Sequence, residues 1–435
     1  MKKIFTIIAL AIGFSMNAQL ATVTEGSNTG QRLSTSTAAN HGDIGSNAVD
    51  LSYSNGASTT RGATAIYSTA MGRNTIASTS NSTAMGYSTT ASGSTSTAMG
   101  YSTTASGSNS TAMGSNAKAT GSTSTAMGSG TEASGSNSTA MGSSTDASGS
   151  NSTAMGYGTE ANQSYSTAMG REALASGSVS TAMGRSTTAS GNTSTAMGRN
   201  TIASGTYSTA MGYGTTASEL YSTAMGVSTI ANGDASTAMG RSTTASDYAS
   251  VVIGQYNSAG SSVTNNATAF NTANTAFVIG NGVSGATSDA FKVMFNGDAT
   301  VSNDLTVNGD VVVNSDMRLK ANIISLGSTL YKLLQIDGKT YTMKRDATQK
   351  QKIGVLAQDI EKVFPELVVE HNGIKSVNYQ GLVPVLINSI KEQDAKINQQ
   401  QVEINKLKEQ DAKMKEQDAK ISRLEALVEK LISNK

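Results

Sequence analysis

The 435-residue sequence contains no cysteine and no tryptophan, and it has only 2 prolines and 7 phenylalanines. Without cysteine it can form neither a disulfide framework nor a lipid-attachment site. Because large side chains are scarce, any long ordered region has to bury small residues in place of a conventional core. The 31 basic and 30 acidic residues almost cancel, so no net charge attracts the chain to nucleic acid or to an anionic membrane. We therefore expect no nucleic-acid partner.

The sequence also lacks the groupings that mark metal and cofactor sites. Its 2 histidines, His41 and His371, are isolated, and no set of His, Asp and Glu residues has the spacing of metal ligands. The acidic residues of 63–258 are scattered, and no insertion there would build the paired-carboxylate pocket of a polysaccharide hydrolase. We expect no metal, no cofactor and no turnover of an external substrate.

Only the N-terminus carries an extended apolar run. Lys2 and Lys3 precede the run 4–14, which is too short to span a bilayer and is typical of a secretory signal peptide cleaved after Ala18. No later apolar run has the length of a membrane span. We expect an exported chain, secreted or held at the cell surface, with no integral membrane anchor in its mature form.

The most regular feature of the sequence is the pentapeptide Ser-Thr-Ala-Met-Gly, which recurs every fourteen residues from Met71 to Met239. Another alanine follows each of these methionines by six residues, from Ala77 to Ala245. A fixed short period indicates stacked structural units. Strand alternation sends Thr and Met to one face and Ser, Ala and Gly to the other. Each coil should therefore hold two short strands that point alanines into a thin interior.

An alanine-lined roll buries little apolar area per coil, so we expect it to be unstable alone. Three chains that pack their Thr/Met faces around one axis would bury the methionine ladder. This is the physical argument for a homotrimer. The repeats resemble the head repeats of YadA-like trimeric autotransporter adhesins, over residues 63–258. That resemblance implies a left-handed parallel β-roll and adhesion to a glycan, to matrix or to a host surface.

Two ladders of variable residues run along the repeats. Two residues after Met, consecutive coils carry Arg171, Arg185 and Arg199, and other coils carry tyrosine there. We regard this stripe as a possible binding ladder, although solvated charge is the commoner role of such positions. Five residues after Met stand Lys118, Glu132, Asp146 and Glu160. We expect this second ladder to be solvated and without a metal.

After the repeats, short β-rich runs with Asn-Gly and Gly-Asp pairs predict a stem over 259–314, formed by hairpins or by intertwined strands. The runs are 276–280, 291–297 and 307–313.

From Ser315 the sequence reads Ser-Asp-Met-Arg-Leu-Lys, followed by Ile-Gly-Val-Leu-Ala-Gln-Asp-Ile at 353–360 and Phe-Pro-Glu-Leu-Val at 364–368. These motifs resemble the intramolecular chaperone and auto-processing domain of endosialidase-type tailspikes and tail fibres. The resemblance implies a domain that trimerises, assists the folding of the fibre before it and then cleaves itself off. Within it, the residues from Ala357 to Phe364 follow a helical pattern that ends before Pro365.

Transferred to this chain, the resemblance makes Ser315 the nucleophile and Lys320 its general base, with cleavage between Asn314 and Ser315. Lysine can take the serine proton only when it is neutral, so its environment has to be buried. The spacing of five places the pair on extended or looped backbone. Asp316 and Arg318 also match the motif, and we expect them to form a local ion pair.

The last 45 residues repeat Lys-Glu-Gln-Asp-Ala-Lys and carry apolar residues at sevenfold spacing, from Ile390 to Leu431, with a phase change near 404–407. This spacing predicts a coiled coil, which would be trimeric in a trimeric fibre. The expected organisation is thus a signal peptide (1–18), an unassigned segment (19–62), a repeat roll (63–258), a β-rich stem (259–314), a small α+β chaperone and peptidase domain (315–390) and a coiled coil (391–435).

The leading interpretation is a mainly β, trimeric fibre or adhesin whose one chemical act is autocatalytic cleavage. A phage-derived tail fibre fits the C-terminal motifs equally well, but the expected signal peptide argues against it. A binding solenoid that never cleaves, and that presents a Ser/Thr lattice to ice or glycan, is the third possibility.

Overall fold

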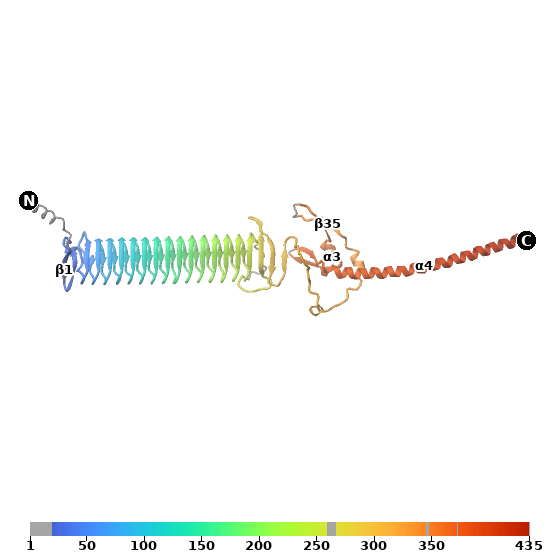
Figure 1. Ribbon diagram of the computed structural model, residues 1–435, viewed down its shortest axis with the longest axis horizontal. Coiled ribbons are helices and arrows are strands. Elements are labelled where there is room, and N and C mark those ends of the chain that lie inside the picture. The colour runs from blue at the N-terminus through green and yellow to red at the C-terminus, as the bar shows by residue number, and fades with distance from the viewer. Residues whose placement is uncertain (1–19, 259–266, 345–347, 372, 435) are drawn as a thin grey trace, which may run out of the picture. The chain divides into compact units, whose positions relative to one another are not determined.

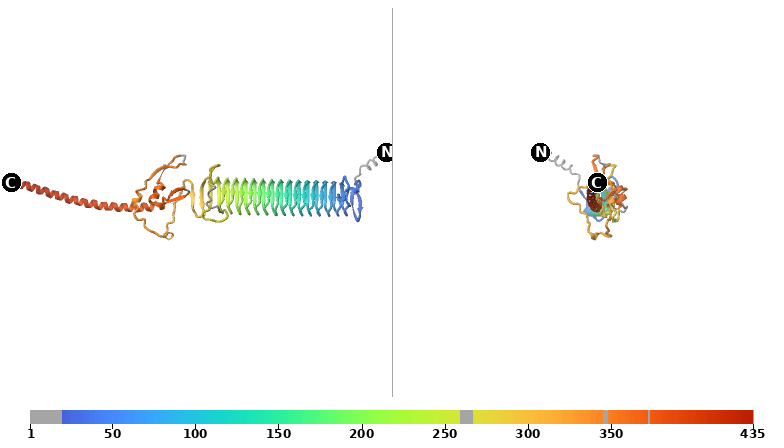
Figure 2. Two further views of the ribbon diagram at one scale, coloured as in Figure 1. Left: turned by 180° about the vertical axis from the view of Figure 1, so that it is seen from behind. Right: turned by 90° about the vertical axis from the view of Figure 1, so that its right-hand side faces the viewer.

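The computed structural model describes residues 20–258, 267–344, 348–371 and 373–434, so the expected signal peptide lies outside the described residues. The chain divides into two compact units, with the division between Val307 and Asn308. The first unit is a β-solenoid, and its coils stack regularly in both side views (Figure 1, Figure 2). The roll expected from the fourteen-residue repeat is therefore confirmed.

Each coil contains one strand of five residues and one of two residues. The long strands are β5 (Thr69–Arg73), β7 (Thr83–Tyr87), β9 (Thr97–Tyr101), β11 (Thr111–Ser115), β13 (Thr125–Ser129), β15 (Thr139–Ser143), β17 (Thr153–Tyr157), β19 (Thr167–Arg171), β21 (Thr181–Arg185), β23 (Thr195–Arg199), β25 (Thr209–Tyr213), β27 (Thr223–Val227), β29 (Thr237–Arg241) and β31 (Val251–Gln255). The short strands are β4 (Gly62–Ala63), β6 (Ile76–Ala77), β8 (Thr90–Ala91), β10 (Thr104–Ala105), β12 (Lys118–Ala119), β14 (Glu132–Ala133), β16 (Asp146–Ala147), β18 (Glu160–Ala161), β20 (Leu174–Ala175), β22 (Thr188–Ala189), β24 (Ile202–Ala203), β26 (Thr216–Ala217), β28 (Ile230–Ala231) and β30 (Thr244–Ala245).

Strands of neighbouring coils pair in parallel and in register, so each residue lies beside its counterpart fourteen positions away. In β11 and β13, for example, Ala112 pairs with Ala126 and Met113 pairs with Met127. In the repeats from Met71 to Met239, the inward strand positions carry only alanine. Both alanines of each coil are fully buried, whereas Thr and Met are half-buried on the outer face. The predicted division between an alanine interior and a Thr/Met face is thus correct.

The solenoid begins before the repeats. β1 (Leu20–Glu25) and β2 (Asn28–Leu33) form an antiparallel hairpin. β2 then pairs in parallel with β3 (Val49–Tyr53), which pairs in parallel with β5. The short 3₁₀ turn η1 (Ala38–Asn40) lies between β2 and β3. Residues 20–62, for which the sequence predicted no role, therefore form the first turns of the solenoid.

The other end is closed in a similar way. β31 pairs in parallel with β32 (Thr275–Asn281), which continues into an antiparallel meander with β33 (Asp289–Met294) and β34 (Ala299–Val301). Antiparallel strands at both ends cover sheet edges that would otherwise be open to pairing with other chains.

Only part of the expected stem is β-structure. The first two β-rich runs form strands, but residues 307–313 do not, and Val312 is 84% exposed. A strand requires a neighbour for its backbone groups, and no described segment pairs with this run.

The second unit is small apart from one long helix. It contains η2 (Met317–Leu319), α2 (Leu330–Leu333), β35 (Lys339–Thr342), β36 (Gln351–Gly354), α3 (Ala357–Val363), η3 (Pro365–Leu367), β37 (Val368–His371), β38 (Ile374–Val377) and α4 (Leu382–Ser433). Its core contains Ile360, Val363 and Phe364, as the helical pattern predicts, together with Leu367 and Val385.

Helix α4 runs for 52 residues without a break, including the phase change near 404–407. Its heptad residues are exposed in the single chain, for example Ile397 and Ile421. None of the described helices combines the length and apolar character needed to cross a lipid bilayer.

The glycine after each methionine allows neighbouring coils to approach closely. Gly156 has φ of +129°, and a Cβ built on it would lie 1.9 Å from the carbonyl oxygen of Gly170. Gly158, two residues later, has φ of +58°, and the nearest atom to its Cβ would be Glu172 Cγ at 3.9 Å. The close contact therefore forbids a side chain at the first position but not at the second.

We predict that Gly156→Ala destabilises the solenoid by about 3 kcal/mol, because it combines a steric clash with a strained φ. Gly158→Ala, the matched control, should cost about 1 kcal/mol, because only the left-handed conformation opposes it. Thermal unfolding of the two variants side by side checks the difference. Equal losses would show that the close approach of the coils is not the constraint.

Candidate functional site

The first candidate site is the segment around Ser315, near the start of the second unit. Asp316 begins the 3₁₀ turn η2, and its side chain accepts the backbone N–H of Arg318 at 2.8 Å. This turn returns the chain so that Lys320 Nζ donates a hydrogen bond to Ser315 Oγ over 2.7 Å. Both residues lie on looped or extended backbone, which agrees with their spacing of five.

The geometry places an amine beside a hydroxyl, as a serine–lysine pair requires. Ser315 and Lys320 are both exposed in the single chain. A lysine becomes a base when burial favours its neutral form. The buried environment that the pair needs would therefore have to come from another surface.

Asp316 and Arg318 form the local ion pair that the sequence predicts. Arg318 Nη2 contacts Asp316 Oδ2 at 2.7 Å, and Arg318 Nε donates to Asp316 Oδ1 at 3.1 Å. The hydrogen bonds from the side chain and backbone of Arg318 lower the pKa of Asp316. The Asp316–Arg318 ion pair fixes the turn between Ser315 and Lys320.

Apolar side chains flank the serine–lysine segment on both sides. Val311, Val312 and Val313 precede it, and Ile323 and Ile324 follow it, each at least 60% exposed. Contiguous exposed apolar residues mark surfaces that are covered by a partner. A partner surface placed here would bury the serine–lysine pair as well.

A carboxylate on the long helix ties that helix to the rest of the unit. Glu392 accepts hydrogen bonds from Ser328 Oγ at 2.7 Å and from the backbone N–H of Thr329, at the start of α2. The bond from Ser328, followed by the one from Thr329, lowers the pKa of Glu392. The buried Thr329 hydroxyl lies 2.9 Å from that of Ser389, also on α4. Sequence patterns could not predict this contact, because its partners are about sixty residues apart.

The second candidate site is the arginine stripe of the solenoid. Arg171, Arg185 and Arg199 pair in register on three consecutive coils and are exposed. The structure therefore brings the three predicted ladder residues together.

The acidic ladder is also stacked as predicted. Lys118 pairs with Glu132 at 3.8 Å, and Asp146 lies between Glu132 and Glu160. Burial, followed by these two neighbouring carboxylates, raises the pKa of Asp146. Across the described ranges, no group of three or more potential ligands could hold a metal ion.

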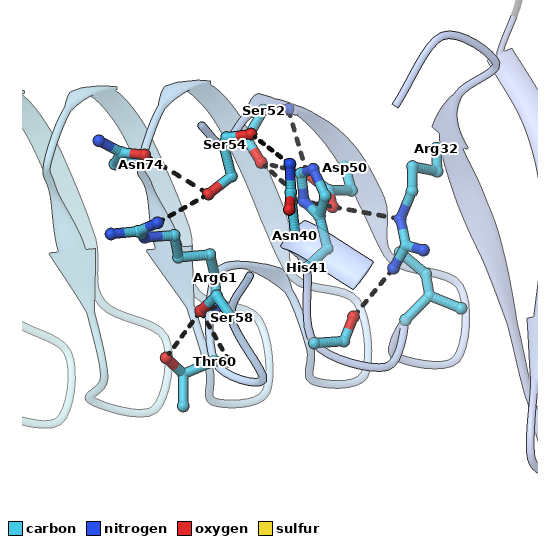
Figure 3. Close-up of polar contacts among 12 residues, drawn as sticks. Arg32, Asn40, His41, Asp50, Ser52, Ser54, Ser58, Thr60, Arg61 and Asn74 are labelled. Carbon is cyan, nitrogen blue, oxygen red and sulfur yellow. Dashed lines mark hydrogen bonds and ion pairs between the residues drawn. The ribbon is translucent and has the colours of Figure 1, made fainter. Parts of the chain in front are cut away.

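A buried polar cluster in the first turns was not predicted. Figure 3 shows Arg32, His41, Asp50 and Ser52 pointing toward one another inside the solenoid. Asp50 Oδ2 lies 3.0 Å from His41 Nδ1 and 3.4 Å from Arg32 Nε, and Ser52 Oγ donates to Asp50 Oδ1 at 2.6 Å. Arg32 also pairs with Glu25 at 2.7 Å. His41 appeared isolated because its partners lie outside the repeat pattern.

This cluster takes the place of the alanine interior. Asp50 occupies the register position of Ala70, and Arg32 occupies that of Asp50 one coil further out. Asp50 and Arg32 are no more than 2% exposed. Burial alone would raise the pKa of Asp50, but the hydrogen bonds from His41 and Ser52 outweigh it, so the pKa is lowered. The pKa of Glu25 is also lowered, since burial is outweighed by Arg32 and by the Ile44 N–H.

The sequence of the chain matches two known families, over separate ranges. The sequence model of the YadA head domain repeat, which spans two copies, matches residues 63–89, 91–117, 119–145, 147–173, 175–201, 203–229 and 231–257. The sequence model described as chaperone of endosialidase matches residues 315–369. No curated protein matches the chain. Both families are trimeric and extracellular or surface-exposed, so the two matches support a trimeric protein that resembles an adhesin or a tail fibre.

The buried cluster makes the N-terminal turns sensitive to acid. A carboxylate whose pKa is lowered by folding adds stability above its unfolded pKa, near 4, and this stability is lost as the pH falls through the folded value. We therefore predict that the β2 and β3 amides lose protection from hydrogen exchange as the pH falls from about 5 to 3. In Asp50→Asn, protection should be weaker at pH 5 and depend less on pH. An unchanged pH profile in that variant would contradict a role for Asp50.

Removing the charge of Glu392 should loosen the start of α2. We predict that Glu392→Gln accelerates exchange of the Thr329 amide by about tenfold, because a neutral side chain accepts a weaker hydrogen bond than a carboxylate. Glu403→Gln, an exposed change on the same helix, is the control and should leave Thr329 unaffected. Equal exchange of the Thr329 amide in the two variants would show that the Glu392 carboxylate does not stabilise the start of α2.

Proposed function

From YadA head repeats followed by a chaperone-of-endosialidase domain, we propose a secreted or cell-surface homotrimeric fibre whose C-terminal domain drives trimerisation and then cuts the chain between Asn314 and Ser315. The hydrogen bond between Lys320 Nζ and Ser315 Oγ is the observation that carries the cleavage. The family match begins at Ser315, which also supports a boundary at this residue.

Trimerisation is supported by three surfaces that the single chain leaves uncovered. The solenoid has a half-buried Thr/Met face, the valines and isoleucines beside Ser315 are exposed, and the heptad residues of α4 are exposed. A trimer would cover all three, since coiled coils and stacked sheets both bury such faces. We propose that the helix over 391–433 forms the trimeric coiled coil.

The proposed cleavage is an acyl shift followed by hydrolysis. Neutral Lys320 takes the proton of Ser315 Oγ, which attacks the carbonyl carbon of Asn314. The bond from that carbon to the Ser315 nitrogen breaks, and Lys320 returns the proton to the nitrogen. The resulting ester joins the Asn314 carbonyl carbon to Ser315 Oγ. Water then hydrolyses it, leaving a carboxylate on Asn314 and a free amine on Ser315.

Assembly would couple this chemistry to folding. Covering the apolar residues on both sides of the pair would bury Lys320, and burial favours the neutral amine. An unassembled chain would stay uncut and keep its C-terminal domain, whereas a trimer would be cut and would release the fibre that ends at Asn314.

We predict that the wild-type chain yields a fragment beginning at Ser315, whereas Ser315→Ala and Lys320→Ala remain intact. Ser325→Ala and Lys362→Ala, which change exposed residues of the same unit, should cleave like the wild type. Intact mass and N-terminal sequencing identify the fragments, and light scattering gives the assembly state.

Hydroxylamine provides a test of the ester, because it cleaves esters faster than water does. It should accelerate release of the fragment ending at Asn314. Wild-type trimers that stay uncut would contradict the peptidase assignment and leave a fibre with a permanent chaperone clamp. Wild-type monomers that cut equally well would contradict the dependence on assembly.

A further inference from the structure

Three arginines stack on consecutive coils of the solenoid with little to neutralise them. Arg171 contacts Glu172 at 3.1 Å, and this is the only ion pair that the three arginines make among the described residues. An arginine is always protonated, and in-register strands lie about 4.8 Å apart. The three positive charges therefore repel one another at close range.

The fold does not require arginine at these positions. Ser115, Ser129 and Ser143 occupy the same register position on three earlier coils. The basic residues of 63–258 are Arg73, Lys118, Arg171, Arg185, Arg199 and Arg241. Three of these six nevertheless lie on consecutive coils.

A tyrosine stands at each end of the stack. Tyr157 pairs in register with Arg171, and Arg199 pairs with Tyr213. Arg171 Cζ lies 5.9 Å from the ring centroid of Tyr157, and Arg199 Cζ lies 5.4 Å from that of Tyr213. These contacts hold the outer guanidinium groups over aromatic rings. We give the name arginine ladder to the five residues that pair in register here: Tyr157, Arg171, Arg185, Arg199 and Tyr213.

We propose that the arginine ladder binds a linear anionic polysaccharide that carries sulfate or carboxylate groups at regular intervals. The guanidinium fork matches both groups in shape and charge. Evenly spaced cations along one line fit a ligand with evenly spaced anions, and an extended sugar chain provides such a repeat.

The tyrosines favour a sugar chain over a nucleic acid. Tyr157 and Tyr213 are about half exposed, but an arginine already lies over one face of each ring, which leaves less of the ring for stacking a base. Their hydroxyls and ring edges remain available to sugar hydroxyls. The inference rests on the proposed surface location of the fibre, where such polysaccharides occur. A trimer would carry three ladders and bind one long chain more tightly than a monomer would.

The test uses the full chain and heparin fragments of defined length as the probe. The variant Arg171→Ser/Arg185→Ser/Arg199→Ser replaces the ladder with the residue that other coils carry. The control variant Arg73→Ser/Lys118→Ser/Arg241→Ser removes the same charge from positions that have no basic neighbour in register. We expect the first to lose about tenfold or more in affinity and the second to lose about twofold or less. Wild-type binding should weaken with salt.

The inference would be overturned if the wild type did not bind heparin, if the two variants lost equal affinity, or if a single-stranded DNA of equal charge bound more tightly. Light scattering of the same samples separates the two proposals. If the ladder variant no longer trimerises while the control does, the arginines form contacts between chains and the inference fails. If the wild type is monomeric but binds heparin through the ladder, the proposal of a trimeric fibre is contradicted and the inference about the ladder stands.

Discussion

The narrow interior of the coil is the constraint from which the rest of the solenoid follows. Ser96, Ala98, Thr103, Ala105 and Gly107 are the buried residues of one coil, and none is larger than threonine. Each side chain also has to fit beside its copies above and below, because the pairing is in register. Within the repeats the sequence therefore varies most where the side chain points outward, and the variable ladders run along those positions.

Because of the same constraint, the interior contributes little to stability, and the outer face has to contribute more. Small buried residues release little apolar area from water, and the methionines that could add more remain half-buried on the outer face. At the N-terminal end the interior is not even apolar, because Arg32 and Asp50 replace the alanine column. Such a buried pair stabilises only when all of its members are present. It ends the alanine column where the roll would otherwise continue.

The sequence was most informative where the structure repeats, and least where a contact is made once. Thirteen copies of the pentapeptide average out chance, so the roll, its alanine interior and its outer face could all be derived from the positions of Met71 to Met239. The Asp50 cluster and the Glu392 contact join residues that no period relates. The strand expected at 307–313 did not form, because strand propensity describes the segment and not the neighbour it needs.

The serine–lysine pair shows a similar limit in its chemistry. The turn at Met317–Leu319 and the Asp316–Arg318 ion pair bring Lys320 to Ser315 within one chain, so the local sequence is sufficient for the geometry. It is not sufficient for the burial on which a lysine base depends, because Lys320 is exposed in the single chain. A pair that is aligned by its own segment but buried only by assembly would act after the fibre has formed and not before. A domain that assists folding has to act in this order, because its removal before the fibre has formed would leave the fibre unfolded.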